Sequence, residues 1–202
     1  MKSLKMLGLA VVAAAALMAV IGAGSASATR ICSVNTSSSC ASPNPTGTQY
    51  TATLKSGTEA TLNAGFATIR CTASSVGLEQ TNAGGGAGTP VAGTITSLSF
   101  SSCGTNTVNV LALGSGSVAW TSEFNGSLTG SGTRVETVVG STKCFYGGEI
   151  TTGLTVTGGA PASGKATAVS LAKEAGSNSL CAATAKWNAE YVFGQTAYVT
   201  NS

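Results

Sequence analysis

The chain has 202 residues, of which 10 are Lys or Arg and 7 are acidic, so that only 8% are charged, against roughly 25% in an average soluble protein. It contains no His, and all seven acidic residues are Glu, so it also contains no Asp. These absences exclude Ser-His-Asp and Cys-His catalysis, aspartic-protease dyads, His-based zinc sites and EF-hand calcium loops. We therefore expect no cofactor, no metal site and no enzyme activity that depends on His, Asp or a metal.

Residues 1–28 have the pattern of a cleavable signal peptide. A short basic start is followed by an apolar stretch over residues 6–21, and Ala26-Ser27-Ala28 matches the small-x-small sequence that signal peptidases cleave. A permanent membrane anchor would need about twenty apolar residues with flanking charge, whereas this stretch ends in Gly and Ser. We predict cleavage after Ala28, a secreted or cell-surface protein, and no stable membrane span after cleavage.

The mature chain is almost electrically neutral. Without Lys2 and Lys5, 8 basic residues stand against 7 Glu, which gives no electrostatic basis for binding nucleic acid. Residues 29–47 contain Cys32, Cys40 and two prolines and are predicted to be an irregular N-terminal arm. Residues 48–202 are predicted to form a single all-β domain.

The predicted strands are short runs rich in Thr, Val, Ile and aromatic residues, separated by Gly, Ser and Asn. They lie at 49–55, 58–62, 67–73, 75–80, 91–101, 107–113, 117–124, 134–139, 149–157, 166–172, 183–193 and 195–200. Only residues 166–175 have a composition that also suits a helix. Many short strands with regular turns predict an antiparallel β-sandwich or barrel with less than about 15% helix.

Six cysteines in an exported chain are expected to pair. The midpoint between Cys71 and Cys103 falls at residue 87, inside the flexible segment 84–88, so these two cysteines can face each other across one hairpin. The same register places Ser74, Val76, Leu98 and Phe100 on one face. Cys32–Cys40 would then close the N-terminal arm, and Cys144–Cys181 follows by elimination, unless a bulge or a bond between sheets changes the scheme.

Two types of candidate binding or catalytic residue are present. Glycosidases need only a pair of carboxylates, and Glu123, Glu136, Glu149 and Glu190 lie in or beside predicted strands. Solvent-exposed carboxylates at strand edges are the simpler interpretation. Trp120 and Trp187 could stack on a sugar if exposed, although aromatic residues more often build the core of a small β domain.

Residues 159–166 nearly match a phosphate-binding loop. Ala166 stands where the loop requires Ser or Thr, and no Asp is available to hold magnesium. A turn between two strands is the better interpretation of this segment.

Four stretches resemble a group of uncharacterised small, secreted, cysteine-containing all-β proteins of high-GC Gram-positive bacteria. They are TQYTATLKSGTEATL (48–62), TPVAGTITSLSFSSC (89–103), LTVTGGAPASGKATAVSLA (154–172) and LCAATAKWNAEYVF (180–193). The resemblance covers most of the mature chain and implies export and β architecture. It carries no catalytic signature.

The sequence favours a secreted or cell-surface β-sandwich protein with a structural, adhesive or binding role, and with a cell-surface glycan or another protein as partner. One alternative is a carbohydrate-binding module or a Glu-dependent glycosidase, which requires an aromatic residue beside a carboxylate. The other alternative is a carrier of a small apolar ligand, which requires an apolar cleft.

Overall fold

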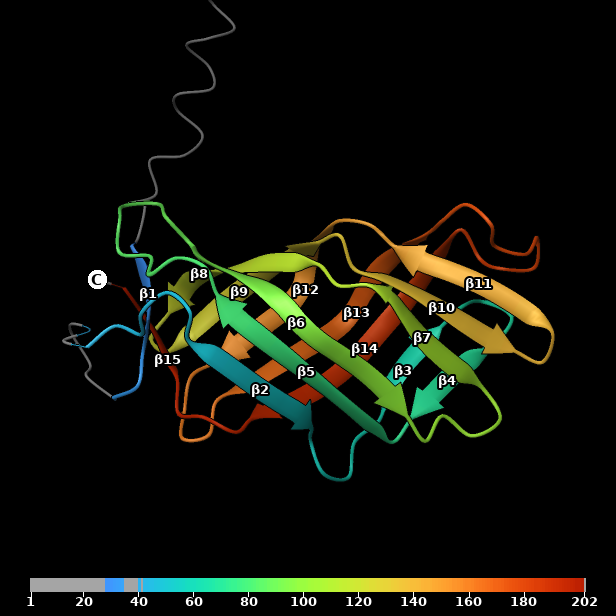
Figure 1. Ribbon diagram of the computed structural model, residues 1–202, viewed down its shortest axis with the longest axis horizontal. Coiled ribbons are helices and arrows are strands. Elements are labelled where there is room, and N and C mark those ends of the chain that lie inside the picture. Colours follow the sequence, from blue (N-terminus) through green and yellow to red (C-terminus); the bar gives the residue numbers. More distant parts are fainter. Residues whose placement is uncertain (1–27, 35–39, 41, 202) are drawn as a thin grey trace, which may run out of the picture.

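The computed structural model describes residues 28–34, 40 and 42–201. Every regular element in this part of the chain is a β-strand, and it contains no helix (Figure 1). The low helix content predicted from the sequence is therefore confirmed for the described residues. Apart from Ala28, the predicted signal peptide lies outside them.

The described residues include no helix with the length and hydrophobicity needed to cross a membrane.

The strands follow one another with short connections. In chain order they are β1 (Thr29–Cys32), β2 (Gln49–Leu54), β3 (Ala60–Asn63), β4 (Thr68–Cys71), β5 (Ala73–Gln80), β6 (Val91–Ser101), β7 (Thr107–Ala112), β8 (Ser115–Ser122), β9 (Asn125–Ser131), β10 (Arg134–Val139), β11 (Thr142–Gly147), β12 (Ile150–Thr157), β13 (Ser163–Lys173), β14 (Thr184–Phe193) and β15 (Tyr198–Asn201). Strands β6 and β10 have the predicted bounds. Most of the others differ from the predicted ones by one to three residues at an end.

Three strands were not predicted. The expectation of an irregular arm at residues 29–47 is wrong at its start, because Thr29–Cys32 forms β1 and pairs with β15. Strand β9 has the sequence NGSLTGS, which resembles a turn, but its neighbours β8 and β12 pair with it on both sides. Strand β11 pairs with β10 and β13. In each case pairing between strands overrides a weak local preference.

The segment 166–175, which could also have been a helix, is mostly strand. Strand β13 pairs with β14 over eight residue positions from Ser163 to Ala172. Ala166 and Val169 are buried, on either side of a register shift. Hydrogen bonding to a neighbouring long strand therefore decides its conformation.

Eight antiparallel strands form a closed barrel, in the order β14-β2-β5-β6-β8-β9-β12-β13, and pairing of β13 with β14 completes the ring. The long strands β13 and β14 extend beyond it and carry additional strands. Strands β3 and β4 continue from β14, whereas β11, β10 and β7 continue from β13, so both groups lie at one end of the molecule (Figure 1). The β1–β15 pair lies at the other end. Of the two predicted all-β architectures, the closed barrel is the one observed.

The three predicted disulfides are present: Cys32–Cys40, Cys71–Cys103 and Cys144–Cys181. The hairpin register is also confirmed near Cys71–Cys103, because Ser74 pairs with Phe100 and Val76 with Leu98. Closer to the turn, a bulge shifts the register by one residue. Cys144–Cys181 does not bridge a hairpin; it ties β11 to the loop between β13 and β14.

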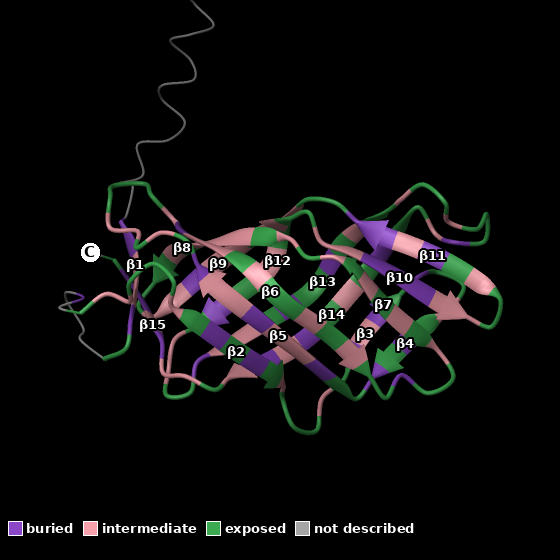
Figure 2. Cartoon of the chain, viewed as in Figure 1, coloured by how far each residue is buried: buried purple, intermediate pink, exposed green. Residues whose placement is uncertain are grey.

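Buried residues alternate with exposed ones along most strands, as expected for strands with one face inward (Figure 2). Many of the fully buried positions hold small side chains, among them Ala52, Ala166, Ala185 and Ala189. Small inward side chains leave part of the barrel interior unfilled.

Candidate functional site

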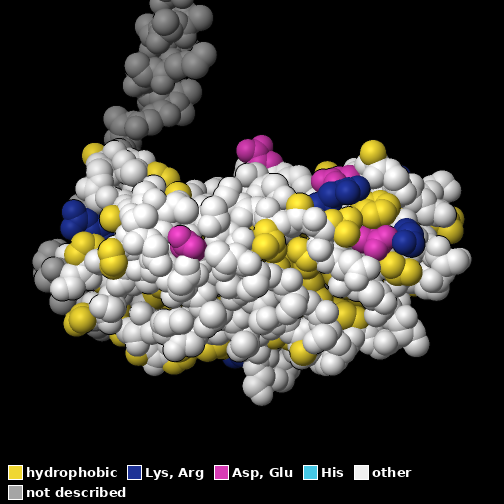
Figure 3. All heavy atoms as spheres, viewed as in Figure 1, with side chains coloured by type: hydrophobic (Ala, Val, Ile, Leu, Met, Phe, Trp, Pro, Cys, Tyr) yellow, Lys and Arg dark blue, Asp and Glu magenta, His cyan; other side chains and the backbone are white. Residues whose placement is uncertain are grey.

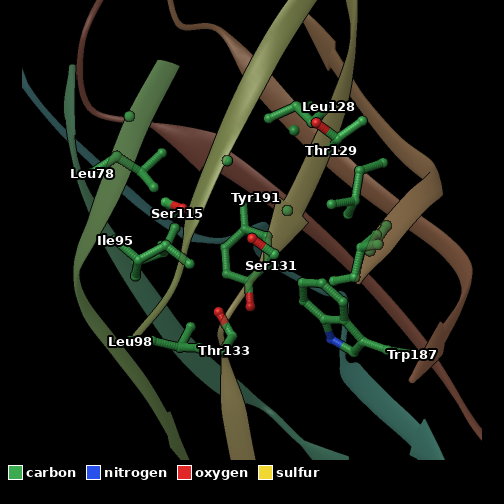
Figure 4. A pocket seen from close by; sticks show the side chains of 18 of the residues that line it. Leu78, Ile95, Leu98, Ser115, Leu128, Thr129, Ser131, Thr133, Trp187 and Tyr191 are labelled. Carbon is green, nitrogen blue, oxygen red and sulfur yellow. The ribbon is translucent and has the colours of Figure 1, made fainter. Parts of the chain in front are cut away.

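The barrel interior contains an apolar cavity of about 270 Å³ that is partly open to the outside. Its lining comes from both the ring and the additional strands, and Figure 4 shows Leu78, Ile95, Leu98, Leu128 and Trp187 around it. Eight-stranded barrels are just wide enough either to be filled by side chains or to hold one small ligand. The volume exceeds the roughly 150 Å³ of an apolar cavity that admits benzene.

Large apolar side chains on the inner face of the barrel are only half-buried. Val76, Leu78, Leu98, Val118 and Leu128 all line the cavity, and none of them reaches full burial. In a packed core such residues would be enclosed by their neighbours. Their remaining accessible surface faces the cavity, where a ligand could cover it.

A row of three glycines explains why this space is unfilled. Gly93 on β6 pairs with Gly116 on β8, and Gly116 pairs with Gly130 on β9. The preceding inward row holds side chains, because Val91 pairs with Val118 and Val118 with Leu128. Since inward positions repeat every second residue, three neighbouring strands supply no inward side chain at the level of the glycines.

The glycines also allow the wall to curve. A Cβ atom at Gly116 would lie 2.5 Å from the carbonyl oxygen of Thr129, and one at Gly93 would lie 2.9 Å from that of Glu79. By contrast, a Cβ at Gly130 would meet nothing closer than 3.6 Å. Close backbone approach thus requires glycine at the first two positions, as is common where barrels bend, but not at Gly130.

An open groove of about 480 Å³ lies on the outer side of the same wall. It shares the three glycines with the cavity, and also Ser115 and Thr129, which are exposed and which strand alternation directs outward; exposed Thr94 lines the groove alone. At this place the wall between cavity and groove is little more than backbone.

The cavity has a second weak boundary between β6 and β7. Strand β6 pairs with β8 only over Val91–Thr94, and a backbone bond from Ile95 N–H to the Gly114 carbonyl follows. Beyond it no ladder joins β6 to β7 within the described chain, because β7 pairs with β10. Figure 3 shows hydrophobic side chains reaching the surface in this region. We call this boundary between β6 and β7, where no pairing of described residues joins the two strands, the seam. It is the clearest route by which a ligand could reach the cavity.

No charged side chain is directed into the cavity by the described strands. Glu79 and Lys165 contribute to its lining, but alternation places both on outward positions. The Glu79 carboxylate accepts a hydrogen bond from Gln49 Nε2 at 2.7 Å, and Lys165 is exposed. The interior therefore offers no counter-ion to a charged ligand.

Three tyrosines provide polar groups in the lining, and one of them, Tyr146, donates its hydroxyl proton to the carbonyl oxygen of Ala182 at 3.4 Å. Tyr50 is fully engaged, because its hydroxyl donates to Gln80 Oε1 and accepts from Asn44 Nδ2, each at 2.8 Å. The Tyr191 hydroxyl lies 2.8 Å from Ser74 Oγ. Burial raises the pKa of both Tyr50 and Tyr191 above the usual value, so both phenols stay protonated at neutral pH.

The structure separates the two candidate tryptophans. Trp187 lines the cavity and packs against Tyr191, with ring centroids 6.5 Å apart. Its Nε1 is buried and has no hydrogen-bond acceptor among the described residues. Trp120 does not line the cavity; it lies on β8, where its backbone N–H donates to Thr29 Oγ1 of β1.

The four candidate glutamates are not brought together at the cavity. Glu190 on β14 forms an ion pair with Lys55, and Glu136 on β10 forms one with Lys143. Glu123 lies in the turn between β8 and β9, and Glu149 borders the outer groove. The hydrogen bond from Asn109, and after it the one from Lys143, lowers the pKa of Glu136. The hydrogen bond from Lys55 lowers the pKa of Glu190. A general acid in a glycosidase requires the opposite shift.

The segment that resembles a phosphate loop connects β12 to β13. It is a turn, as expected: Gly159 exchanges backbone hydrogen bonds with Ala197, and β13 begins at Ser163. No group of three or more His, Cys, Asp or Glu side chains suited to a metal occurs in the described part of the chain.

The lowered pKa values of Glu136 and Glu190 predict a loss of stability in acid. Each carboxylate has a lower pKa when folded than when unfolded, so its contribution is complete above the unfolded value near 4.5 and is lost as the pH falls through the folded value. We expect the free energy of unfolding, measured in urea, to decrease below about pH 4.5. The decrease should be shallower in Glu136→Gln; an identical pH profile for that variant would contradict this assignment.

Comparison with protein-family models, with curated proteins and with solved structures gives no match to this chain. The interpretation of the site therefore rests on its own geometry.

The sequence indicated Trp187 as a candidate, and the alternative of a ligand carrier required an apolar cleft, but the place of the cavity was not predicted. The missing signal was the register of three glycines that lie far apart in the sequence. It becomes visible only when β6, β8 and β9 are placed side by side.

Proposed function

We propose that this protein binds a small, uncharged, apolar molecule inside the barrel and carries it outside the cell. The observation that supports the proposal most directly is the apolar cavity of about 270 Å³. Ligand sites are typically concave and mostly apolar, with a few polar groups that fix orientation. The half-buried side chains and the glycine row give this cavity that character.

Transport outside the cell is supported by the disulfides and by the leader pattern in the sequence. Three disulfides join all six cysteines, and such bonds persist mainly in oxidising compartments. Export and cleavage after Ala28 remain a proposal. The mass of the protein recovered from the medium tests it, and a mass that includes residues 1–28 would contradict it.

The ligand is proposed to be neutral because the cavity provides nothing to pair with a charge. Transfer of an unpaired carboxylate from water to an apolar interior costs many kcal/mol. Apolar surface buried by a neutral ligand is instead favourable, at about 25 cal/mol per Å². The site thus favours neutral molecules over their carboxylate analogues.

Naphthalene and 2-naphthoate make a matched pair of probes, because they share a ring system and differ in charge. Calorimetric titration of the oxidised protein should detect naphthalene binding. At a free concentration 100 times the Kd, naphthalene should stabilise the fold by about 2.7 kcal/mol, which raises the Tm by about 5–10 °C.

We expect 2-naphthoate to give neither heat nor stabilisation. Equal binding of the two probes would contradict the selection for neutral ligands. No response to naphthalene at its solubility limit would contradict the function.

The carbohydrate alternative has less support. Of the two candidate tryptophans, Trp187 is turned toward Tyr191 within the cavity, and the carboxylate of Glu190, on the same strand, is paired with Lys55. Sugar recognition needs an aromatic face together with polar partners, and Trp187 and Glu190 do not form that arrangement.

A further inference from the structure

The direction of one hydrogen bond indicates which polar group the ligand carries, if the cavity is the binding site proposed above. Tyr191 is buried, lies on β14 and lines the cavity. Figure 4 shows its ring among the lining side chains, with the hydroxyl on the side of Leu98 and Thr133 in this view. What this hydroxyl can offer a ligand depends on where its single proton points.

Ser74 fixes that direction. A serine hydroxyl has one proton to donate, and Ser74 Oγ donates it to the carbonyl oxygen of Ser99 at 2.8 Å. A carbonyl oxygen can only accept. Because the Ser74 proton is already committed, the 2.8 Å contact between Ser74 Oγ and Tyr191 Oη must use the proton of Tyr191.

Tyr191 Oη is therefore left as an acceptor. Its proton points to Ser74, and no other hydrogen bond to Oη occurs within the described chain. Tyr50 provides the contrast, because its oxygen both donates and accepts within the protein. Tyr146, the third lining tyrosine, also only donates, to the carbonyl oxygen of Ala182, but it is completely buried, whereas Tyr191 keeps 7% of its surface accessible.

We propose that the ligand is a neutral apolar alcohol or phenol whose hydroxyl donates a hydrogen bond to Tyr191 Oη. A ketone, ester or ether of the same size has no donor for Tyr191 Oη and could only accept, for example from Trp187 Nε1, which has no acceptor in the described part of the chain. A hydroxyl group, by contrast, can donate to Tyr191 and also accept. A hydrocarbon would leave that lone pair unused. The hydrogen bonds from Tyr191 to Ser74 and from Ser74 to Ser99 thus favour a hydrogen-bond donor at the position of Tyr191 Oη.

The test uses three bicyclic probes of similar size: 2-naphthol, naphthalene and 1-tetralone. Calorimetric titration gives the Kd of each for the wild type, Tyr191→Phe and Ser74→Ala. Removal of the Tyr191 hydroxyl leaves the ligand hydroxyl without its partner. We therefore expect Tyr191→Phe to weaken 2-naphthol binding by roughly five- to tenfold or more and to change naphthalene binding by less than about twofold.

Ser74→Ala tests the orientation of the proton. Without Ser74 Oγ the Tyr191 hydroxyl can turn and donate to a ligand, so 1-tetralone should gain affinity relative to 2-naphthol. An unchanged ratio would overturn the argument about direction. Equal weakening of naphthalene and 2-naphthol by Tyr191→Phe would assign Tyr191 a packing role only, and would also overturn the inference.

These outcomes are distinct from failure of the proposed function. If none of the three probes binds the wild type, the cavity is not a ligand site and both proposals fall. If naphthalene binds but the wild type and both variants have the same Kd values for all three probes, the proposed ligand binding is supported and the selection by Tyr191 is wrong. Thermal unfolding of each variant, with a Tm close to the wild-type value, shows that the fold is retained.

Discussion

Gly130→Leu is expected to abolish naphthalene binding while preserving the fold. Gly130 occupies an inward position of β9, two residues from Leu128 in the cavity lining. A Cβ there would meet only the Ser115 carbonyl oxygen, at 3.6 Å, and φ at this residue is not positive. A leucine side chain can therefore be accommodated, and it would occupy space that a ligand needs.

We expect the Kd of the Gly130→Leu variant for naphthalene to rise at least tenfold, equivalent to about 1.4 kcal/mol of lost binding free energy. Its stability should be unchanged or higher, since filling a cavity restores packing contacts. Calorimetric titration and urea unfolding measure the two effects separately.

Thr129→Leu provides the matched control. Thr129 is the neighbouring residue on the same strand and is exposed. It belongs to the lining of both the cavity and the outer groove, and strand alternation directs its side chain to the outer face. The same side chain added on this face should leave naphthalene affinity within about twofold of wild type, because it does not enter the cavity. If both variants lose affinity equally, the ligand is bound in the outer groove and the assignment to the barrel interior is wrong.

Loss of the Cys71–Cys103 disulfide is expected to lower stability more than loss of the Cys32–Cys40 disulfide. This bond closes a loop of 32 residues that contains the whole β5–β6 hairpin. On the chain-entropy model its removal costs about 3.7 kcal/mol, against about 2.5 kcal/mol for the 8-residue loop closed by Cys32–Cys40. Both cysteines of the longer loop also belong to the main core cluster, so their replacement leaves unfilled space.

The comparison of Cys71→Ala/Cys103→Ala with Cys32→Ala/Cys40→Ala separates loop length from the general effect of disulfide removal. We expect the first pair of substitutions to lower the Tm by about 7–15 °C and the second to lower it less. Thermal unfolding of the two oxidised variants tests this order. A larger loss for the Cys32–Cys40 pair would show that local packing outweighs loop entropy.

The seam between β6 and β7 adds a functional consequence. Cys103 lies in the turn that joins these strands, and the bond to Cys71 anchors the turn to β4. Without it the two unpaired edges are held together less tightly. The Cys71→Ala/Cys103→Ala variant should therefore also release naphthalene faster. The rate of release can be measured after the naphthalene-loaded variant is mixed with an excess of ligand-free wild-type protein, which captures the released naphthalene.

Local pattern was sufficient for part of the fold. Alternating residues with β preference indicated most strands, because the side-chain period of a strand is an intrinsic property of the backbone. The β5–β6 register near Cys71–Cys103 was also predictable, since a hairpin turn fixes which residues face each other. The absence of His and Asp limited the possible chemistry directly.

Only the tertiary structure decided the rest. Closure into a barrel depends on β13 pairing with β14 and on strand order across the ring, which no local signal contains. The cavity arises because Gly93, Gly116 and Gly130 meet in register on three strands. The free lone pair of Tyr191 arises because its hydroxyl donates its hydrogen bond to Ser74, 117 positions away. The sequence alone determined most of the strands, the absence of His and Asp, and one hairpin; the proposed site follows from contacts between residues that are distant in the chain.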